Sequence, residues 1–233
     1  MSKDINNQIQ ILKKKFEARQ FKEVINESLI ILKKSDNDFL WNIVGLSFQH
    51  LNQYKKSIDC FENAIQVNSK NFTAYNNLGI SYKKLKQYKK AEDYLLRAIE
   101  INPNYVNAMV NIGNVKNETY FFDDAIKYYK KAIELNNKLP LIYLNIATVY
   151  QTINKIDESK KYLNEALNID ETFTIADQKL SMLEKYDIKN LHLKKMVNKL
   201  NSEKLNATQN KYLCFGISKA FKDLKDYQNS FKY

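Results

Sequence analysis

Small residues recur along this chain at a spacing of 34 residues, and this period restricts the possible folds more than any other feature. Three columns keep the spacing: Gly45, Gly79, Gly113 and Ala147; Ser57, Ala91, Ala125 and Ser159; and Ala64, Ala98, Ala132 and Ala166. Large apolar residues keep it too, as in Val44, Leu78, Ile112 and Ile146. Each period therefore carries one structural unit, and the chain repeats that unit.

Each unit is expected to form two short helices joined by a tight turn. In 71–105, the first helix carries Tyr75 and Leu78 at helical spacing, and the second carries Leu95 and Ala98. A helix of about a dozen residues is marginal alone, so its apolar stripe must be buried against neighbours. Small residues let helices approach closely, and several hairpins must stack because one cannot bury its whole apolar face. The period predicts an all-α protein built as a right-handed solenoid of helical hairpins.

The order of these columns resembles the tetratricopeptide repeat (TPR) family, which has the same period and the same alternation of large and small residues. Four units carry the resemblance: 38–71, 72–105, 106–139 and 140–173. The resemblance implies a concave groove lined by the first helices of successive units. Lys116 departs from the pattern, because it stands where Phe48, Tyr82 and Tyr150 place an aromatic ring. We expect this departure to loosen single contacts and to leave the fold intact.

The residues outside the four units follow the pattern less closely. We expect a divergent N-terminal helical hairpin over 1–37, an irregular helical connector over 174–205 and an incomplete TPR-like hairpin over 206–233. A terminal unit faces solvent on one side, which explains weak columns in the first hairpin. The last residues reach about halfway into an expected second helix, so the sequence suggests a fragment of a longer protein.

A second resemblance concerns the last part of the chain. The segment from His192 to Met196, followed by Tyr212 to Tyr233, resembles the stretch that joins TPR repeats to the catalytic domain in bacterial TPR-linked sulfotransferases. The resemblance implies a substrate-recruiting N-terminal region of a larger protein, whose catalytic domain would use the sulfate donor PAPS. The alternative is a stand-alone TPR adaptor, or a self-assembling scaffold, with no enzymatic domain.

The residues of this chain do not form a recognisable catalytic set. His50 and His192 fall in separate units, and neither has a cysteine or carboxylate at metal-ligand spacing. Cys60 and Cys214 are too few for a disulfide framework. A phosphate-binding loop needs a glycine-rich turn between strand and helix, whereas the four glycines lie in helical patterns. We therefore expect no catalytic, cofactor-binding or metal-binding residues, no cofactor, and no enzyme activity in this chain.

The net charge of +11 raises the question of an acidic partner. Almost all the basic residues are lysines, and Arg19 and Arg97 are the only arginines. Nucleic-acid readers usually use arginine for bidentate contacts, so we expect no nucleic-acid partner. No apolar run approaches the ~20 residues needed to span a membrane. The first 20 residues lack the apolar core of a signal peptide, and we expect a cytoplasmic protein without membrane partners.

A row of asparagines is the main candidate binding feature. Asn77, Asn111 and Asn145 occupy the same place in three units, so we expect them to line the groove. Because an asparagine amide is both donor and acceptor, such a row can hold the backbone of an extended protein or peptide segment. The other candidate groove residues are Asn76, Asn107, Asn114, Asn117, Gln49, Gln151, Lys83 and Lys84; the two lysines would assist an acidic ligand.

Two further interpretations of the surface stay open from the sequence. Asparagine is common in this chain, so the row could equally reflect composition rather than ligand binding. The end hairpins, which lack a stacking neighbour on one side, could also pair with a second copy of the chain.

Overall fold

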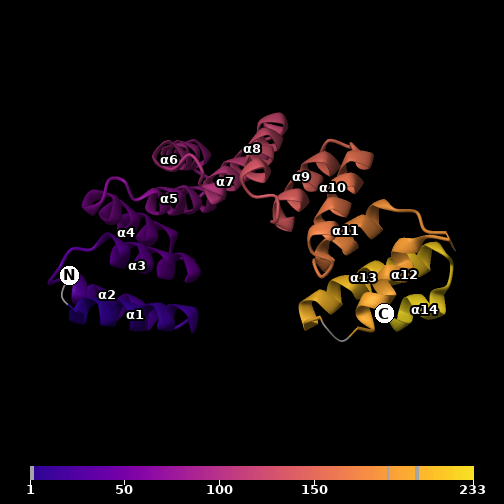
Figure 1. Ribbon diagram of the computed structural model, residues 1–233, viewed down its shortest axis with the longest axis horizontal. Helices are drawn as coiled ribbons and strands as arrows, with labels where there is room; N and C mark the ends of the chain where they lie inside the picture. Colours follow the sequence, from indigo (N-terminus) through magenta and orange to yellow (C-terminus); the bar gives the residue numbers. More distant parts are fainter. Residues whose placement is uncertain (1–2, 188, 203–204) are drawn as a thin grey trace. The chain divides into compact units, whose positions relative to one another are not determined.

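The computed structural model describes residues 3–187, 189–202 and 205–233 and shows them as short helices connected by turns (Figure 1). This confirms the predicted all-α class. The helices fall into two compact units, Met1–Asp124 and Ala125–Tyr233, with the boundary inside α8 (Phe122–Leu135). We call them the N-terminal unit and the C-terminal unit and describe each by itself.

The N-terminal unit consists of three helical hairpins, the helix α7 and the beginning of α8. The helices are α1 (Lys3–Glu17), α2 (Phe21–Leu32), α3 (Asp38–His50), α4 (Tyr54–Val67), α5 (Phe72–Lys84), α6 (Tyr88–Ile101) and α7 (Val106–Glu118). Each helix from α1 to α6 packs against the next along the chain, and α5 also packs against α3 and α7. First helices of neighbouring hairpins therefore lie beside one another, which is the arrangement that the period predicts.

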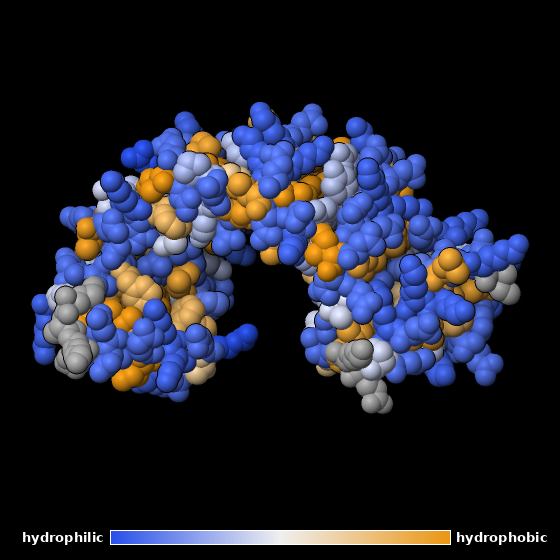
Figure 2. Space-filling view, in the orientation of Figure 1, coloured by the Kyte–Doolittle hydropathy of each residue, from blue (hydrophilic) through white to orange (hydrophobic). Residues whose placement is uncertain are grey.

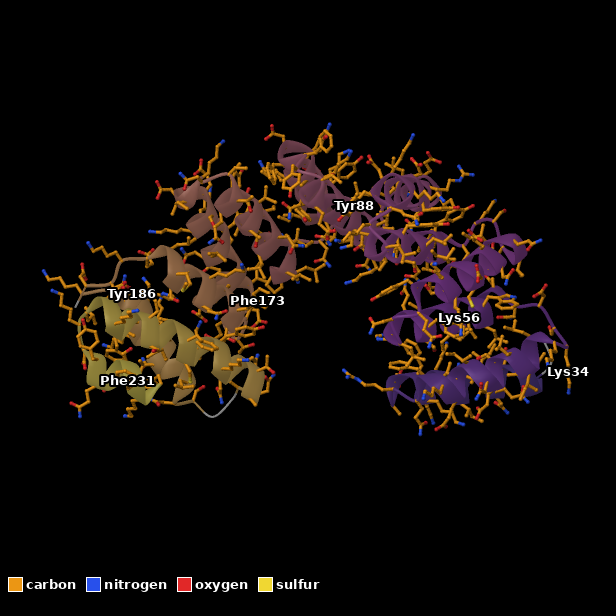
Figure 3. The ribbon with its side chains drawn as sticks, turned by 180° about the vertical axis from the view of Figure 1, so that it is seen from behind. Lys34, Lys56, Tyr88, Phe173, Tyr186 and Phe231 are labelled. Carbon is orange, nitrogen blue, oxygen red and sulfur yellow. The ribbon has the colours of Figure 1, made fainter. Side chains whose placement is uncertain are left out.

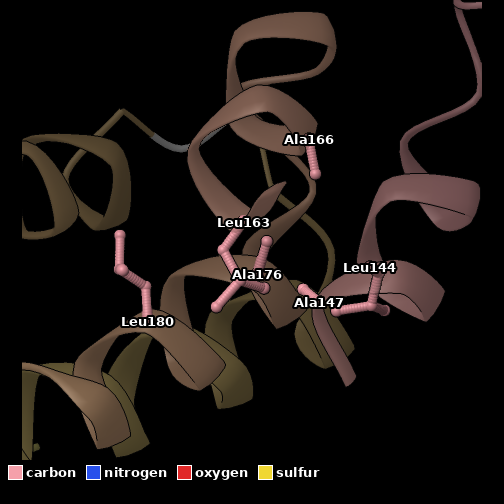
Figure 4. Packing of buried hydrophobic residues seen from close by; sticks show 6 residues of the cluster. All are labelled: Leu144, Ala147, Leu163, Ala166, Ala176 and Leu180. Carbon is pink, nitrogen blue, oxygen red and sulfur yellow. The ribbon is translucent and has the colours of Figure 1, made fainter. Parts of the chain in front are cut away.

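The C-terminal unit begins with regular helices and ends with a different arrangement. After the remainder of α8 come α9 (Pro140–Thr152), α10 (Ile156–Ile169), α11 (Thr174–Leu183), α12 (Leu191–Leu200), α13 (Ala207–Asp223) and α14 (Tyr227–Lys232). Buried residues of α9, α10 and α11 form one core, shown in Figure 4: Leu144, Ala147, Leu163, Ala166, Ala176 and Leu180.

Side-chain caps fix where several helices begin. Asn37 accepts a hydrogen bond of 3.0 Å from the backbone N–H of Leu40 at the start of α3, and Asn71 accepts one of 2.9 Å from Ala74 at the start of α5. Each cap satisfies one of the backbone donors that a helix leaves open at its N-terminus. Pro140 stands in the first turn of α9, where a missing N–H does no harm.

The small-residue columns mark the closest contacts between paired helices. A Cβ atom built on Gly45 would lie 2.5 Å from Cε1 of Phe61, and one built on Gly79 would lie 2.4 Å from Cγ of Leu95. Phe61 and Leu95 are both fully buried. The glycines are therefore required by the packing of α3 on α4 and of α5 on α6.

Lys116, the departure from the aromatic column, has replacement contacts. Its Nζ lies 2.7 Å from Oε1 of Glu92 on α6, and it also lies over the ring of Phe121, 5.1 Å from the ring centre. An ion pair and a cation–π contact thus stand where other units place an aromatic ring. The Nζ atom of this lysine makes both replacement contacts.

The order of packing changes after α11. In the earlier hairpins the second helix follows the first within a few residues, but here residues 184–190 lead instead to α12, and α13 packs against both α11 and α12. Gly216 of α13 makes the close approach: a Cβ atom there would lie 3.0 Å from Sδ of Met196 and 3.2 Å from Oγ of Ser181. The helix α13 therefore takes the place beside α11 that a second helix occupies elsewhere.

The turns inside the hairpins share an unusual backbone conformation. Among the described residues, six non-glycine residues in these turns have positive φ angles of 58–66°: Arg19, Asn52, Lys86, Tyr120, Asn154 and Lys225. A side chain in this region costs ~1–2 kcal/mol, and asparagine tolerates it better than most residues.

Replacing Lys86 by glycine should therefore stabilise the fold. We expect the Lys86→Gly variant to raise the free energy of unfolding by about 1 kcal/mol, measured by urea unfolding of the whole chain. Asn52→Gly is the matched control and should change it by less than half as much. Equal effects at the two turns, or a loss of stability in Lys86→Gly, would contradict this explanation.

The exposed surface is mainly polar. Figure 2 shows hydrophilic residues over most of the visible face of each unit, with smaller apolar areas between them. Among the residues that the structure describes, no helix combines the length and apolar character needed to cross a bilayer.

Candidate functional site

Four asparagine side chains form a continuous line of hydrogen bonds across three helices of the N-terminal unit. Nδ2 of Asn111 on α7 donates to Oδ1 of Asn76 on α5 at 2.9 Å. Asn76 donates to Oδ1 of Asn77 at 3.2 Å, and Asn77 donates to Oδ1 of Asn42 on α3 at 3.0 Å. We call Asn111, Asn76, Asn77 and Asn42 the asparagine chain. It links the first helices of three successive hairpins.

The asparagine chain is buried in the middle and more open at its ends. Asn76 and Asn77 are 4% and 8% exposed, whereas Asn42 and Asn111 are half-buried. An asparagine amide offers two N–H donors and an oxygen with two lone pairs. Within the asparagine chain, Asn76 and Asn77 each use one N–H donor and one lone pair of the amide oxygen. The buried pair thus sets the orientation of the two outer amides.

Gln49 fixes the asparagine chain from a second direction. Its Nε2 donates to the backbone oxygen of Asn77 at 2.8 Å and to Oγ of Ser81 at 2.7 Å. Ser81 in turn lies 2.7 Å from Oγ of Ser57 in α4. The polar groups between α3, α4 and α5 are therefore tied into one network, which limits the movement of the asparagine side chains.

The other predicted groove residues of the N-terminal unit differ in exposure and in their contacts. Lys83 pairs with Oε1 of Glu118 at 3.2 Å, so its charge is already partly neutralised, and Lys84 is exposed. Asn107 is exposed, while Asn114 and Asn117 are half-buried on α7. Hydrogen bonds thus join Asn76, Asn77, Asn111 and Gln49, and no bond in the structure joins Lys84 or Asn107 to that network.

Two predicted residues belong to the C-terminal unit. Asn145 and Gln151 are half-buried on α9. Their role in ligand binding stays a prediction.

Asn42 belongs to the asparagine chain, although the repeat pattern does not identify it as a candidate. The column that contains Asn77 and Asn111 places Ile43 in the first regular unit, and Ile43 is buried. The side chain of Asn42, one residue earlier, reaches Asn77 instead. Its counterpart 34 residues later is Asn76, and this second pair of equivalent asparagines is the signal in the sequence that could have identified it.

The C-terminal unit contains a polar cluster that sequence spacing also does not reveal. Asp177 of α11 is fully buried, and its carboxylate accepts hydrogen bonds from Nζ of Lys199 on α12 at 2.9 and 3.0 Å. Nε2 of His192 lies 3.1 Å from Oδ1 of Asp177, and Nδ1 of His192 lies 2.6 Å from the hydroxyl of Tyr186, labelled in Figure 3. We call these four residues the aspartate cluster. It fastens α12 to α11.

Burial raises the pKa of two ionisable side chains, Cys60 and Tyr186. Burial, together with the nearby carboxylate of Asp59, raises the pKa of the Cys60 thiol to about 12, so that the thiol stays protonated and unreactive. Burial also raises the pKa of Tyr186, which keeps its hydroxyl neutral beside His192. Within the described ranges, no group of three or more His, Cys, Asp or Glu side chains could hold a metal ion.

Comparisons with known proteins agree with this fold. Models of the tetratricopeptide repeat match residues 72–105, 106–139 and 141–173, and a TPR repeat model matches 45–86. These matches together span 45–173, more than half of the chain. A comparison with the sequences of curated proteins gave no match.

Solved structures of TPR proteins resemble the chain over most of its length. The crystal structure of MamA is 25% identical, with a TM-score of 0.61, and the match covers 69% of this chain and 95% of MamA. TTC0263, a thermophilic TPR protein from Thermus thermophilus, is 15% identical with a TM-score of 0.66, over 76% of this chain and 97% of its own. YrrB, described as a TPR protein with an unusual peptide-binding site, is 16% identical with a TM-score of 0.54, over 87% and 94%.

The chain belongs to the tetratricopeptide repeat family. Its fold is a scaffold of helical hairpins suited to protein or peptide binding.

Proposed function

We propose that the N-terminal unit binds an extended segment of a partner protein through the asparagine chain. The observation that carries this proposal is the line of hydrogen-bonded amides from Asn111 to Asn42, which crosses three successive first helices. An extended peptide presents N–H and C=O groups along its length. A row of amides can meet these groups without reading the peptide's side chains.

In this proposal the inner and outer asparagines have different tasks. Asn42 and Asn111 are half-buried and each keeps donor and acceptor capacity for the peptide backbone. Asn76 and Asn77, buried between them, act as positioning residues that hold the outer amides in place. A pre-oriented amide loses less rotamer entropy on binding than a free surface side chain, which favours affinity.

The similarity to YrrB supports the fold behind this proposal and not its site, because the two sequences share 16% identity. The predicted contributions of Asn107, Asn114, Asn117 and Lys84 stay part of this proposal. Ligand binding by Asn145 and Gln151 of the C-terminal unit stays a separate proposal, as does the cytoplasmic location.

Removing the two outer asparagines should weaken peptide binding. Because the natural ligand is unidentified, the probe is a peptide selected from a random library on the whole chain and then synthesised with a fluorescent label. We expect Asn42→Ala plus Asn111→Ala to raise the dissociation constant of this peptide at least about fivefold, since each lost hydrogen bond contributes ~0.5–1.5 kcal/mol. Fluorescence anisotropy measures the change.

The matched control removes two exposed loop asparagines. Asn104→Ala plus Asn137→Ala takes away the same number of amides outside the asparagine chain and should leave the affinity within about twofold, as expected for peripheral contacts. Thermal unfolding of both double variants shows that each is folded at the temperature of the assay. The proposal fails if the two double variants bind equally well, or if selection yields no peptide.

A sulfotransferase-linked parent protein stays a separate proposal. It rests on the sequence of 187–233 and would make the asparagine chain a recruiting site for the acceptor of the sulfate group. The coding sequence after Tyr233 tests it: a following domain with a glycine-rich phosphate loop supports the idea, and a nearby stop codon argues against it. In the latter case the chain would act as an adaptor.

Self-association through the end hairpins is also a proposal. Ile11 and Ile30 of the first hairpin are 52% and 59% exposed, and Phe231 of α14 is 91% exposed. Light scattering over a concentration series distinguishes the possibilities, because a constant monomer mass at high concentration would exclude this contact.

A further inference from the structure

The C-terminal unit contains a polar cleft between two helices that belong to different parts of the repeat pattern. The cleft has a volume of about 440 Å³ and lies between α10, a regular second helix, and α12, the helix that interrupts the pattern. This volume is in the range of pockets that hold small ligands, ~300–1,000 Å³. The asparagine chain is in the other unit, so the cleft is a separate feature.

The aspartate cluster fixes one wall of this cleft. Asp177 lies at the inner side, and its ion pair with Lys199 and its contact with His192 hold the polar face of α12 at a set distance from α11. Close to these polar contacts on the same helix, Met196 is fully buried and packs against α13. A helix fastened by both polar and apolar contacts is preorganised, which lowers the entropy cost of binding.

Four side chains that line the cleft are exposed and have no hydrogen-bond or ion-pair partner among the described residues: Asn168, Glu171, Lys195 and Asn198. Two of them are amides on opposite walls, with Asn168 near the end of α10 and Asn198 on α12. Lys195 lies on the same helix as Asn198, three residues earlier, and therefore on the same face. The cleft thus offers one ammonium group and two amide groups, with the amides on opposite walls.

We propose that this cleft binds a short peptide segment that carries an acidic side chain. The amides of Asn168 and Asn198 would meet the peptide backbone, and Lys195 would meet the carboxylate of an aspartate or glutamate side chain. A phosphate or a nucleic-acid backbone fits less well, because the unpaired carboxylate of Glu171 also lines the cleft and would repel a multiply charged anion. This inference does not depend on the function proposed for the asparagine chain.

The probe for this site is the tripeptide Gly-Asp-Gly, blocked at both ends so that its side chain holds its single charge. In a titration of the whole chain followed by NMR, we expect the side-chain amide signals of Asn168 and Asn198 to shift to saturation. Blocked Gly-Asn-Gly lacks the charge and should bind about fivefold more weakly, as expected for the loss of one partly exposed ion pair. Inorganic phosphate is the competing anion.

Two neighbouring lysines give a matched pair of variants. Lys195→Ala should weaken Gly-Asp-Gly about fivefold, whereas Lys194→Ala, on the same helix and outside the lining, should change it by less than about twofold. Both positions are exposed, so neither variant should unfold the unit. Equal weakening by the two variants, no saturable shift of Asn168 and Asn198, or phosphate binding as strong as that of the peptide would each overturn the proposal.

Discussion

We expect Lys199→Met to lower the free energy of unfolding by about 3 kcal/mol, more than any other substitution considered for this protein. The substitution keeps most of the apolar side-chain stem but removes the ammonium group that lies 2.9 Å from Oδ2 of Asp177. Asp177 is fully buried, and an incompletely paired buried charge typically costs ~3–5 kcal/mol. The remaining contact with His192 places the expected loss at the lower end of this range. Urea unfolding of the whole chain measures it.

A double variant separates loss of the charge pair from loss of packing. Asp177→Asn removes the buried charge itself, so Lys199→Met in that background should cost less than about 1 kcal/mol. Lys195→Met, at an exposed position of the same helix, should be nearly neutral. If Lys199→Met cost the same with and without the carboxylate, the aspartate cluster would not be what fastens α12.

Gly79→Ala is the second large effect, with an expected net loss of about 2 kcal/mol. The new Cβ atom would lie 2.4 Å from Cγ of Leu95 and 3.0 Å from the backbone oxygen of Ala91, so the packing of α5 on α6 must open. Overpacking of this kind costs ~1–3 kcal/mol and occasionally more. Alanine recovers about 1 kcal/mol through its higher helix propensity. The midpoint of urea unfolding should fall accordingly.

Gly216→Ala is the matched control for this substitution. There the nearest atom is Sδ of Met196 at 3.0 Å, on a flexible side chain that can move by a few tenths of an ångström. We expect a change within about 0.5 kcal/mol, because the gain in helix propensity offsets the small displacement. Equal losses at Gly79 and Gly216 would mean that the glycine columns do not report the closeness of paired helices.

The regular part of the fold could be predicted because every repeat shows the same pattern of large and small residues, so several segments of the sequence indicate the same helical hairpin. The columns of Gly79 and Ala91 predict close helix pairs, and those residues are buried at such contacts. The contacts of Lys116 could not be predicted in this way. They depend on Glu92 of the preceding hairpin and on Phe121 in the turn after α7, and both side chains contact the lysine.

The parts that escaped prediction are those where the period ends. The sequence of 174–205 predicts helices, but it does not show that α13 packs beside α11 or that Asp177 meets Lys199 and His192. These residues are 15 and 22 positions apart and come from helices of different character. Their meeting is decided by tertiary packing, which a periodic pattern cannot report.

For the candidate site, the sequence places asparagines at equivalent positions of successive first helices, but it does not reveal the hydrogen bonds between them. Asn77 was expected to face a ligand, whereas the structure shows it 8% exposed and bonded to Asn42 and Asn76. A set of equivalent residues at a fixed spacing in the sequence shows only which face of its helix each residue occupies. It does not show that amides from neighbouring helices satisfy one another, which depends on the rotamers of all four side chains.

Peptide binding by the asparagine chain is tested most directly by NMR of the asparagine side-chain amides during titration with the library-selected peptide. The expected result is that the signals of Asn42 and Asn111 shift together, with one midpoint that equals the dissociation constant from anisotropy. A titration that leaves both signals unchanged, or that shifts only residues of the C-terminal unit, would contradict the proposed site.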